Sequence, residues 1–162
     1  MKKSRTLLIL IIIFSVVGAS WGERVVDKDS VKLIDHNGLV YEEGSDTPFT
    51  GKIVAHWPNG QKKSEIEYVD GKRQGKEFTW SEDGQKLYEG ENFSGQSYGK
   101  VRAWHENGQQ AIEVELRNSK PNGKWIEWHE NGKKKMEKEL RNGQVISTKC
   151  WDENGKLKPC ED

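Results

Sequence analysis

Apolar residues are distributed in two different ways along this chain. Near the N-terminus, an unbroken apolar run extends from Leu7 to Val17. Beyond residue 22, apolar positions form short stretches separated by Gly, Asn and charged residues, and no stretch keeps the spacing of three and four residues that marks a helix face. This pattern predicts short β-strands joined by tight turns, so the expected fold class is all-β.

The region after the apolar run repeats with a period of 24 residues, the sign of a repeat architecture. The period defines repeats at residues 51–74, 75–98, 99–122, 123–146 and, in part, 147–162. Residues 23–50 precede them and contain a degenerate hairpin, turning at His36-Asn37-Gly38, that we expect to cap the stack and shield its open edge. The columns that carry the period are Gly60, Gly84, Gly108, Gly132 and, one residue early, Gly155; Gly51, Gly75, Gly99 and Gly123; Gly71, Gly95, Ser119 and Gly143; and Trp80, Trp104, Trp128 and Trp151.

The first Gly column predicts the turn of a β-hairpin in each repeat. Asn-Gly or Asp-Gly precedes most strand starts, and such pairs supply the positive φ that a tight turn needs. We expect a three-residue loop ending in Gly, because that loop places Phe78 opposite Tyr88 and Ile126 opposite Met136, whereas a two-residue loop would place Phe78 opposite Glu89. The predicted turn glycines are Gly60, Gly84, Gly108, Gly132 and Gly155.

This register predicts an elongated, single-layer antiparallel meander of repeated β-hairpins with two unlike faces. One face is expected to combine Val54, Phe78 and Ile126 with the Trp column and the apolar residues of the returning strands, interrupted by Gly90 and Lys138. The other face is expected to carry Trp125 and two solvated columns of carboxylates, moderated by neighbouring lysines. The carboxylates are Glu65, Glu89, Glu113 and Glu137, and Glu67, Glu91, Glu115 and Glu139.

The N-terminal apolar run has the features of a secretory signal peptide at residues 1–22. Lys2, Lys3 and Arg5 precede it, small residues follow it, and it is shorter than the roughly 20 residues of a membrane-spanning helix. Cleavage after Ser20 and cleavage after Gly22 both fit, and an uncleaved anchor is the alternative. No Cys lies near either site, so an N-terminal lipid-modified Cys is not expected. The predicted location is secreted or periplasmic.

The iterated motifs resemble a known family. They are Trp128-His129-Glu130-Asn131-Gly132-Lys133-Lys134, the segment from Leu140 to Gly143, and the segment from Pro48 to Lys52. Together they resemble the MORN-variant repeat, as found in bacterial proteins labelled YwqK-type antitoxins, over roughly residues 31 to 157. The resemblance implies a single-layered sheet of successive hairpins, and interaction with a protein or a membrane surface more than catalysis.

Few residues of the sequence are candidates for a disulfide, a metal site or a catalytic site. Cys150 and Cys160 follow an export signal, which favours a disulfide between them over free thiols or an intermolecular bridge. His105 and His129 occupy the same repeat position, but equivalent positions lie about 10 Å apart, too far for a two-histidine metal site. No nucleophile, zincin or phosphate-loop motif is present. We therefore predict no enzyme activity, no metal and no cofactor.

Composition narrows the classes of partner. The 26 basic and 26 acidic residues balance along the chain, which argues against nucleic acid binding. Hydrophobic residues make up only 33% of the chain, which suits a thin architecture. We expect a non-enzymatic exported repeat protein that binds a protein or an envelope component, with membrane-surface contact possible; the alternative is an antitoxin or immunity-like inhibitor of an exported toxin. The candidate interaction surface, which could equally be a packed core, is Trp80, Trp104, Trp125, Trp128 and Trp151.

Overall fold

A computed structural model describes residues 24–30 and 32–161, and the predicted signal peptide lies outside these residues. The predicted all-β class is confirmed: the described residues form strands and turns, without a helix that could cross a membrane. The strands are β1 (Val25–Asp27), β2 (Leu33–His36), β3 (Leu39–Glu42), β4 (Gly51–His56), β5 (Lys62–Val69), β6 (Lys72–Trp80), β7 (Lys86–Phe93), β8 (Gln96–Trp104), β9 (Gln110–Arg117), β10 (Lys120–Trp128), β11 (Lys134–Arg141), β12 (Gln144–Trp151) and β13 (Leu157–Lys158).

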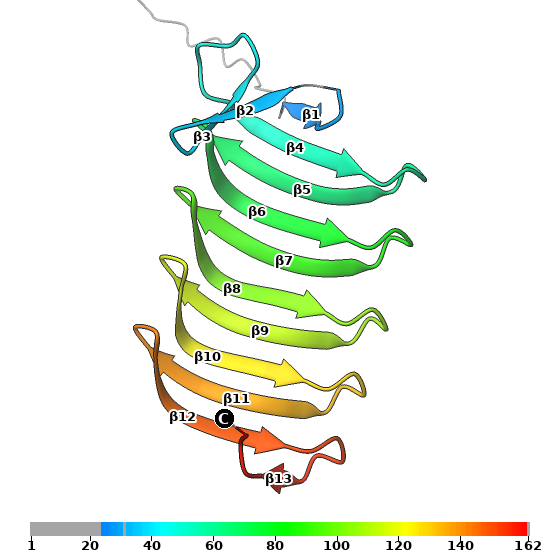
Figure 1. Cartoon of the computed structure of the whole chain (residues 1–162), viewed down its shortest axis with the longest axis vertical. Helices are drawn as coiled ribbons and strands as arrows, with labels where there is room; N and C mark the ends of the chain where they lie inside the picture. Colours follow the sequence, from blue (N-terminus) through cyan, green and yellow to red (C-terminus); the bar gives the residue numbers. More distant parts are fainter. Residues whose placement is uncertain (1–23, 31, 162) are drawn as a thin grey trace, which may run out of the picture.

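The main sheet is an open meander, as predicted. From β4 to β13 each strand pairs antiparallel with the next in sequence, and β1 is added beside β4. The hairpins follow one another along the long axis of the molecule (Figure 1). Each repeat therefore contacts only its neighbours. We call the margin with the Trp column the Trp margin, and the opposite one the far margin.

Two kinds of turn alternate between these margins. At the Trp margin the main-chain amide of Trp57 donates to the carbonyl of Gln61, which closes a three-residue loop, and Gly60 at its end has φ +84°. The loops that follow repeat this geometry. At the far margin the strands are joined by two-residue turns in which both residues have positive φ, the mirror-image turn that suits the twist of paired strands. These turns are Asp70-Gly71, Ser94-Gly95, Asn118-Ser119 and Asn142-Gly143.

A β-bulge follows each of the first four three-residue loops. Beside the second loop, Trp80 lies opposite Lys86, as a three-residue loop requires, but Thr79 lies opposite Tyr88. Leu87 is therefore an extra residue, and it shifts the rest of the hairpin by one position.

The bulge overturns the predicted cross-strand pairs. Phe78 lies opposite Glu89 and Ile126 opposite Glu137, so the predicted pairing of Phe78 with Tyr88 and of Ile126 with Met136 is wrong. Because directly opposed residues share a face, the returning strands present the other set of side chains to each face.

The two faces are therefore composed differently from the prediction. What we call the charged face carries the Glu columns together with Phe78, Ile126 and the Trp column. What we call the apolar face carries the aliphatic residues of the returning strands and also Trp125, which the sequence placed among the carboxylates. One row across the charged face reads Val54, Glu65, Phe78, Glu89, Arg102, Glu113, Ile126, Glu137 and Lys149. The apolar face includes Ile53, Ile66, Val101, Ile112, Val114, Trp125, Met136 and Leu140.

The N-terminal segment covers one end of the sheet. The hairpin of β2 and β3 forms a separate sheet, with a two-residue turn at Asn37-Gly38 and His36 paired with Leu39. It packs on the apolar face of the first repeat, where Phe49 is 2% exposed and contacts a cluster of Val26, Ile53 and Tyr68. The sheet edge beside β4 is occupied by β1, which runs parallel to it, so within this N-terminal segment the strand and not the hairpin lies along that edge.

The C-terminal end is fastened covalently. β13 pairs with β12 only at Cys150 and Trp151, and Cys150 lies opposite Lys158. Cys150 and Cys160 form a disulfide with their Cα atoms 5.3 Å apart. Closing this loop restricts the unfolded chain and holds a two-residue strand that little else supports.

Candidate interaction surface

A ladder of alternating indole rings and lysine ammonium groups runs along the Trp margin of the charged face. The Nζ atom of Lys62 lies 5.5 Å from the ring centre of Trp80, and that of Lys86 lies 5.6 Å from the ring centre of Trp104. Lys134 is placed in the same way over Trp151, at 5.3 Å. Each lysine thus reaches from its own hairpin to the ring of the next. These distances are those of cation–π contacts, and we call the set the Trp–Lys ladder.

Carboxylates of the charged face hold the lysines in place. Lys62 donates to Glu65 at 2.6 Å and Lys134 donates to Glu137 at 2.5 Å. In each case the hydrogen bond from the lysine is the main reason that the pKa of the carboxyl is lowered, although burial opposes it. Each of these lysines therefore pairs with a carboxylate of its own strand as well as with a ring of the next hairpin.

The third repeat achieves the same charge balance by a different route. Gln110 stands where the other repeats have lysine, and Arg102 stands where they have Val54, Phe78 or Ile126. The Nε atom of Arg102 donates to Glu113 at 2.9 Å, and Lys100 donates to the other oxygen of Glu113 at 2.9 Å. The Nε2 atom of Gln110 is buried and has no hydrogen-bond partner among the described residues. In this repeat the cation beside the carboxylate therefore lies on β8, at Arg102, and not on β9, at Gln110.

Ring nitrogens join successive repeats at this margin. The indole Nε1 of Trp57 donates to the carbonyl of Trp80, and the Nε2 atoms of His105 and His129 lie 3.0 Å from the carbonyls of Trp128 and Trp151. Because a carbonyl only accepts, each imidazole must carry its proton on Nε2. Both histidines thus act as connectors. Within residues 24–30 and 32–161, no cluster of three or more His, Cys, Asp or Glu side chains could hold a metal ion.

Trp125 is separate from the other four predicted surface tryptophans. It lies on the apolar face, opposite Val114 on one neighbouring strand and Lys138 on the other. The Nζ atom of Lys138 is 5.9 Å from its ring centre, and its indole Nε1 is buried without a partner in the described part of the chain. The structure therefore brings Trp80, Trp104, Trp128 and Trp151 together and places Trp125 among packed side chains.

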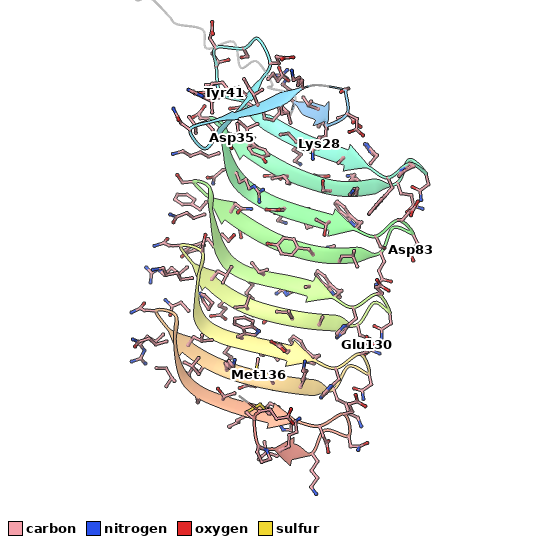
Figure 2. The ribbon with its side chains drawn as sticks, viewed as in Figure 1. Lys28, Asp35, Tyr41, Asp83, Glu130 and Met136 are labelled. Carbon is pink, nitrogen blue, oxygen red and sulfur yellow. A yellow bond between two sulfur atoms is a disulfide. The ribbon has the colours of Figure 1, made fainter. Side chains whose placement is uncertain are left out.

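Figure 2 labels Met136, also of the apolar face, in the middle of the sheet, and Asp83 and Glu130 at the Trp margin.

Gly90 and Lys138, which interrupt the apolar pattern, each fit a neighbour on that face. A Cβ atom at Gly90 would meet the phenol of Tyr88, which lies across it. Burial of this phenol raises the pKa of Tyr88, and the nearby carboxylate of Glu77 adds to the effect. Lys138 places its ammonium group near the ring of Trp125.

The sequence reasoning missed an exposed aromatic pair at the far margin. Phe93 is 66% exposed and Tyr98 is 48% exposed. Their repeat positions hold Val69, Arg117 and Arg141, and Gln74, Asn122 and Ile146, so neither ring is explained by the period. A comparison of equivalent repeat positions could have found this pair, because both rings depart from the residues at the other positions of their columns.

The geometry defines the class of protein. It is a single-layer repeat protein in which successive hairpins place equivalent turns at the same two margins of the sheet. Among known families, the model of the MORN repeat variant matches residues 121–142, which include β10 from Pro121 on and all of β11. The match supports a MORN-repeat protein, a class of non-catalytic repeat modules that generally bind proteins or membranes. No curated protein matches the chain.

Proposed function

We propose that this chain is an exported, non-enzymatic interaction module that binds another protein, or a component of the cell envelope, through the Trp–Lys ladder of its charged face. The observation that carries the proposal is the absence of a second layer over this face in the described residues. The rings of Trp80, Trp104 and Trp151 are half-buried, so part of each ring is open to a partner. Trp is among the residue types that contribute most to the binding energy of protein interfaces.

The length of the ladder suits an extended partner. Trp80 and Trp151 belong to β6 and β12, six strand spacings apart, which corresponds to about 30 Å. Along this distance a Trp ring recurs every second strand, and a lysine lies over each of these rings except Trp128, where Gln110 replaces it. A partner with acidic groups at a similar spacing would meet several equivalent lysines at once, and a repeated weak contact gains strength when its copies act together.

Export is part of the proposal. The predicted signal peptide and the Cys150–Cys160 disulfide both suit a compartment outside the cytoplasm, where disulfides persist. Mass spectrometry of the mature protein tests this directly: we expect an N-terminus at Trp21 or Glu23. Recovery of the protein with Met1 from membranes would contradict cleavage and support the uncleaved anchor.

Binding through the ladder is tested by site-specific photo-crosslinking in living cells. A photoreactive residue in place of Gln110, inside the ladder, is expected to give one crosslinked product that is lost in a Lys86→Gln, Lys134→Gln double variant. The matched control places the photoreactive residue at Lys120, on the far margin, and is expected to give none. A product of equal yield at both positions would contradict the proposal. A crosslinked toxin whose activity the chain inhibits would favour the immunity-like role over a scaffold role.

A further inference from the structure

A hollow lined by polar side chains and two exposed rings lies at the far margin of the sheet, away from the Trp–Lys ladder. Its volume is about 520 Å³. It is formed where β6, β7, β8 and β9 meet, and volumes of this size are typical of small-ligand sites. Its lining residues are Gln74, Glu91, Asn92, Phe93, Tyr98, Arg117 and Asn118.

The register explains why these side chains converge. Glu91 lies directly opposite Tyr98, and Phe93 is two residues from Glu91 on the same strand, so the three share a face. Gly99 lies opposite Leu116, which places Arg117 beside Tyr98 on the next strand. Two rings and two opposite charges from three strands are thus neighbours.

The polar groups of the hollow are available to a ligand. Among the described residues, the side chains of Glu91, Tyr98, Arg117 and Asn118 make no hydrogen bond or ion pair with other protein groups. Gln74 uses only its oxygen, which accepts from the amide of Ser94 at 2.9 Å. The site therefore offers guanidinium and amide donors, a carboxylate acceptor and a hydroxyl that can do both.

We propose that this hollow binds a neutral oligosaccharide. A pyranose ring presents apolar C–H groups on its face and hydroxyl groups around its rim. The faces of Phe93 and Tyr98 suit the former, and the mixed donors and acceptors of Arg117, Glu91 and Asn118 suit the latter. A phosphate group fits poorly, because Glu91 stands beside the single cation. A peptide added as a strand also fits poorly, because β7 and β8 are already paired on both sides.

The repeat supplies matched controls. Ile146 occupies the repeat position of Tyr98 and is 57% exposed, and Val69 occupies that of Phe93 and is 46% exposed. Both are exposed apolar residues at the same margin but outside the hollow. A general loss of apolar surface would affect them as much as the two rings.

The test is an NMR titration of the full mature chain with two soluble probes, chitotriose and maltotriose. We expect at least one probe to shift the amide signals of Arg117 and Asn118, and Tyr98→Ala and Phe93→Ala each to weaken binding at least about fivefold. Arg117→Gln is expected to weaken binding as well, whereas Ile146→Ala and Val69→Ala should leave it unchanged. Circular dichroism melts check that each variant is folded.

Several outcomes would overturn the inference. One is the absence of any shift at these amides with either sugar up to about 20 mM, the range of a very weak complex. Another is equal affinity in Tyr98→Ala and the parent protein. A third is a shift at the same amides with the tripeptide Ala-Leu-Ala but with neither sugar. A failure here would leave the Trp–Lys ladder proposal standing, because the two sites lie on opposite margins.

Discussion

The imidazole of His105 donates from Nε2 to the main-chain carbonyl of Trp128, across a distance of 3.0 Å and from one repeat to the next. The same bond joins His129 to Trp151, and the indole of Trp57 makes it to Trp80. Ser81 occupies this position in the second repeat, and its hydroxyl bonds within its own loop, to Asp83 and Gln85. The joint between the second and third repeats is therefore built differently from the others.

Removing this connector should destabilise the stack. We expect His105→Ala to lower the free energy of unfolding by about 1 kcal/mol, because the carbonyl of Trp128 loses a half-buried donor. Urea unfolding followed by Trp fluorescence measures the change. His36→Ala, which alters an exposed histidine of the N-terminal hairpin, is the control and should change stability by less than about 0.5 kcal/mol. Equal losses in the two variants would contradict a connecting role for His105.

A second connector is missing at the same joint, and it can be restored. The Nδ2 atoms of Asn59 and Asn107 donate to the carbonyls of Glu82 and Glu130, each at 2.6 Å, whereas Asp83 has no amide to donate. Asp83→Asn should therefore raise stability, by about 0.5 to 1 kcal/mol. The reciprocal change, Asn107→Asp, should lower it by a similar amount. Thermal melts of both variants check the pair, and a shift of the same sign in both would show that this amide does not join the repeats.

The turns of this fold could be predicted from the sequence, but the register could not. Gly at the end of a loop is a local requirement, and Gly84 has the expected positive φ, +86°. The pairing of Phe78 was predicted on the assumption that a carboxylate would not lie beside a ring. In a single layer this cost is small, because the ammonium group of Lys86 lies 5.0 Å from the ring centre of Phe78 and 3.0 Å from Glu89. Lys86 contacts both the ring of Phe78 and the carboxylate of Glu89, and the pattern of apolar residues in the sequence does not predict this double contact.

For the candidate surface too, the alignment of the residues could be predicted from the sequence, but the face on which they lie could not. A column of tryptophans every 24 residues shows that Trp80, Trp104 and Trp128 lie in line, whatever the register. Which face they occupy depends on the bulge, and so does the position of Trp125. The hydrogen bonds that ring nitrogens make between repeats join residues 22 or 23 positions apart, and a sequence read one repeat at a time does not show them.

Acid should weaken the protein through the carboxylates of the charged face. The pKa values of Glu65, Glu113 and Glu137 are lowered from 4.5, chiefly by hydrogen bonds from Lys62, Lys100 and Lys134. The unfolded chain then takes up more protons on acidification than the folded one, so stability present above about pH 4.5 is lost as the pH falls through the lowered values. Melting temperatures between pH 7 and pH 3 test this. Glu113→Gln should make the fall shallower, and an unchanged slope would contradict the assignment.

The exchange of cation between Arg102 and Gln110 predicts a coupling between these two positions. Arg102→Ile alone should destabilise the protein by about 1 kcal/mol, because Glu113 loses one of its two partners. Gln110→Lys alone should change stability little, because the new cation lies near Arg102. The double variant restores the pattern of the fourth repeat, and we expect it to exceed the sum of the single changes by at least about 0.5 kcal/mol. Additive changes in urea unfolding would mean that the two positions act independently.

Trp125 gives the most direct test of the register. On the charged face, as the sequence suggested, its loss would leave stability unchanged. In the structure it packs on the apolar face opposite Val114 and Lys138, so Trp125→Ala should lower the free energy of unfolding by about 2 to 3 kcal/mol, somewhat less than the loss of a fully buried ring. Tyr98→Ala removes an exposed ring from the same sheet and should cost less than about 0.5 kcal/mol. If the two variants unfolded at the same urea concentration as the parent, Trp125 would have to lie on the solvated face and every strand pairing described for β10 would be displaced by one residue.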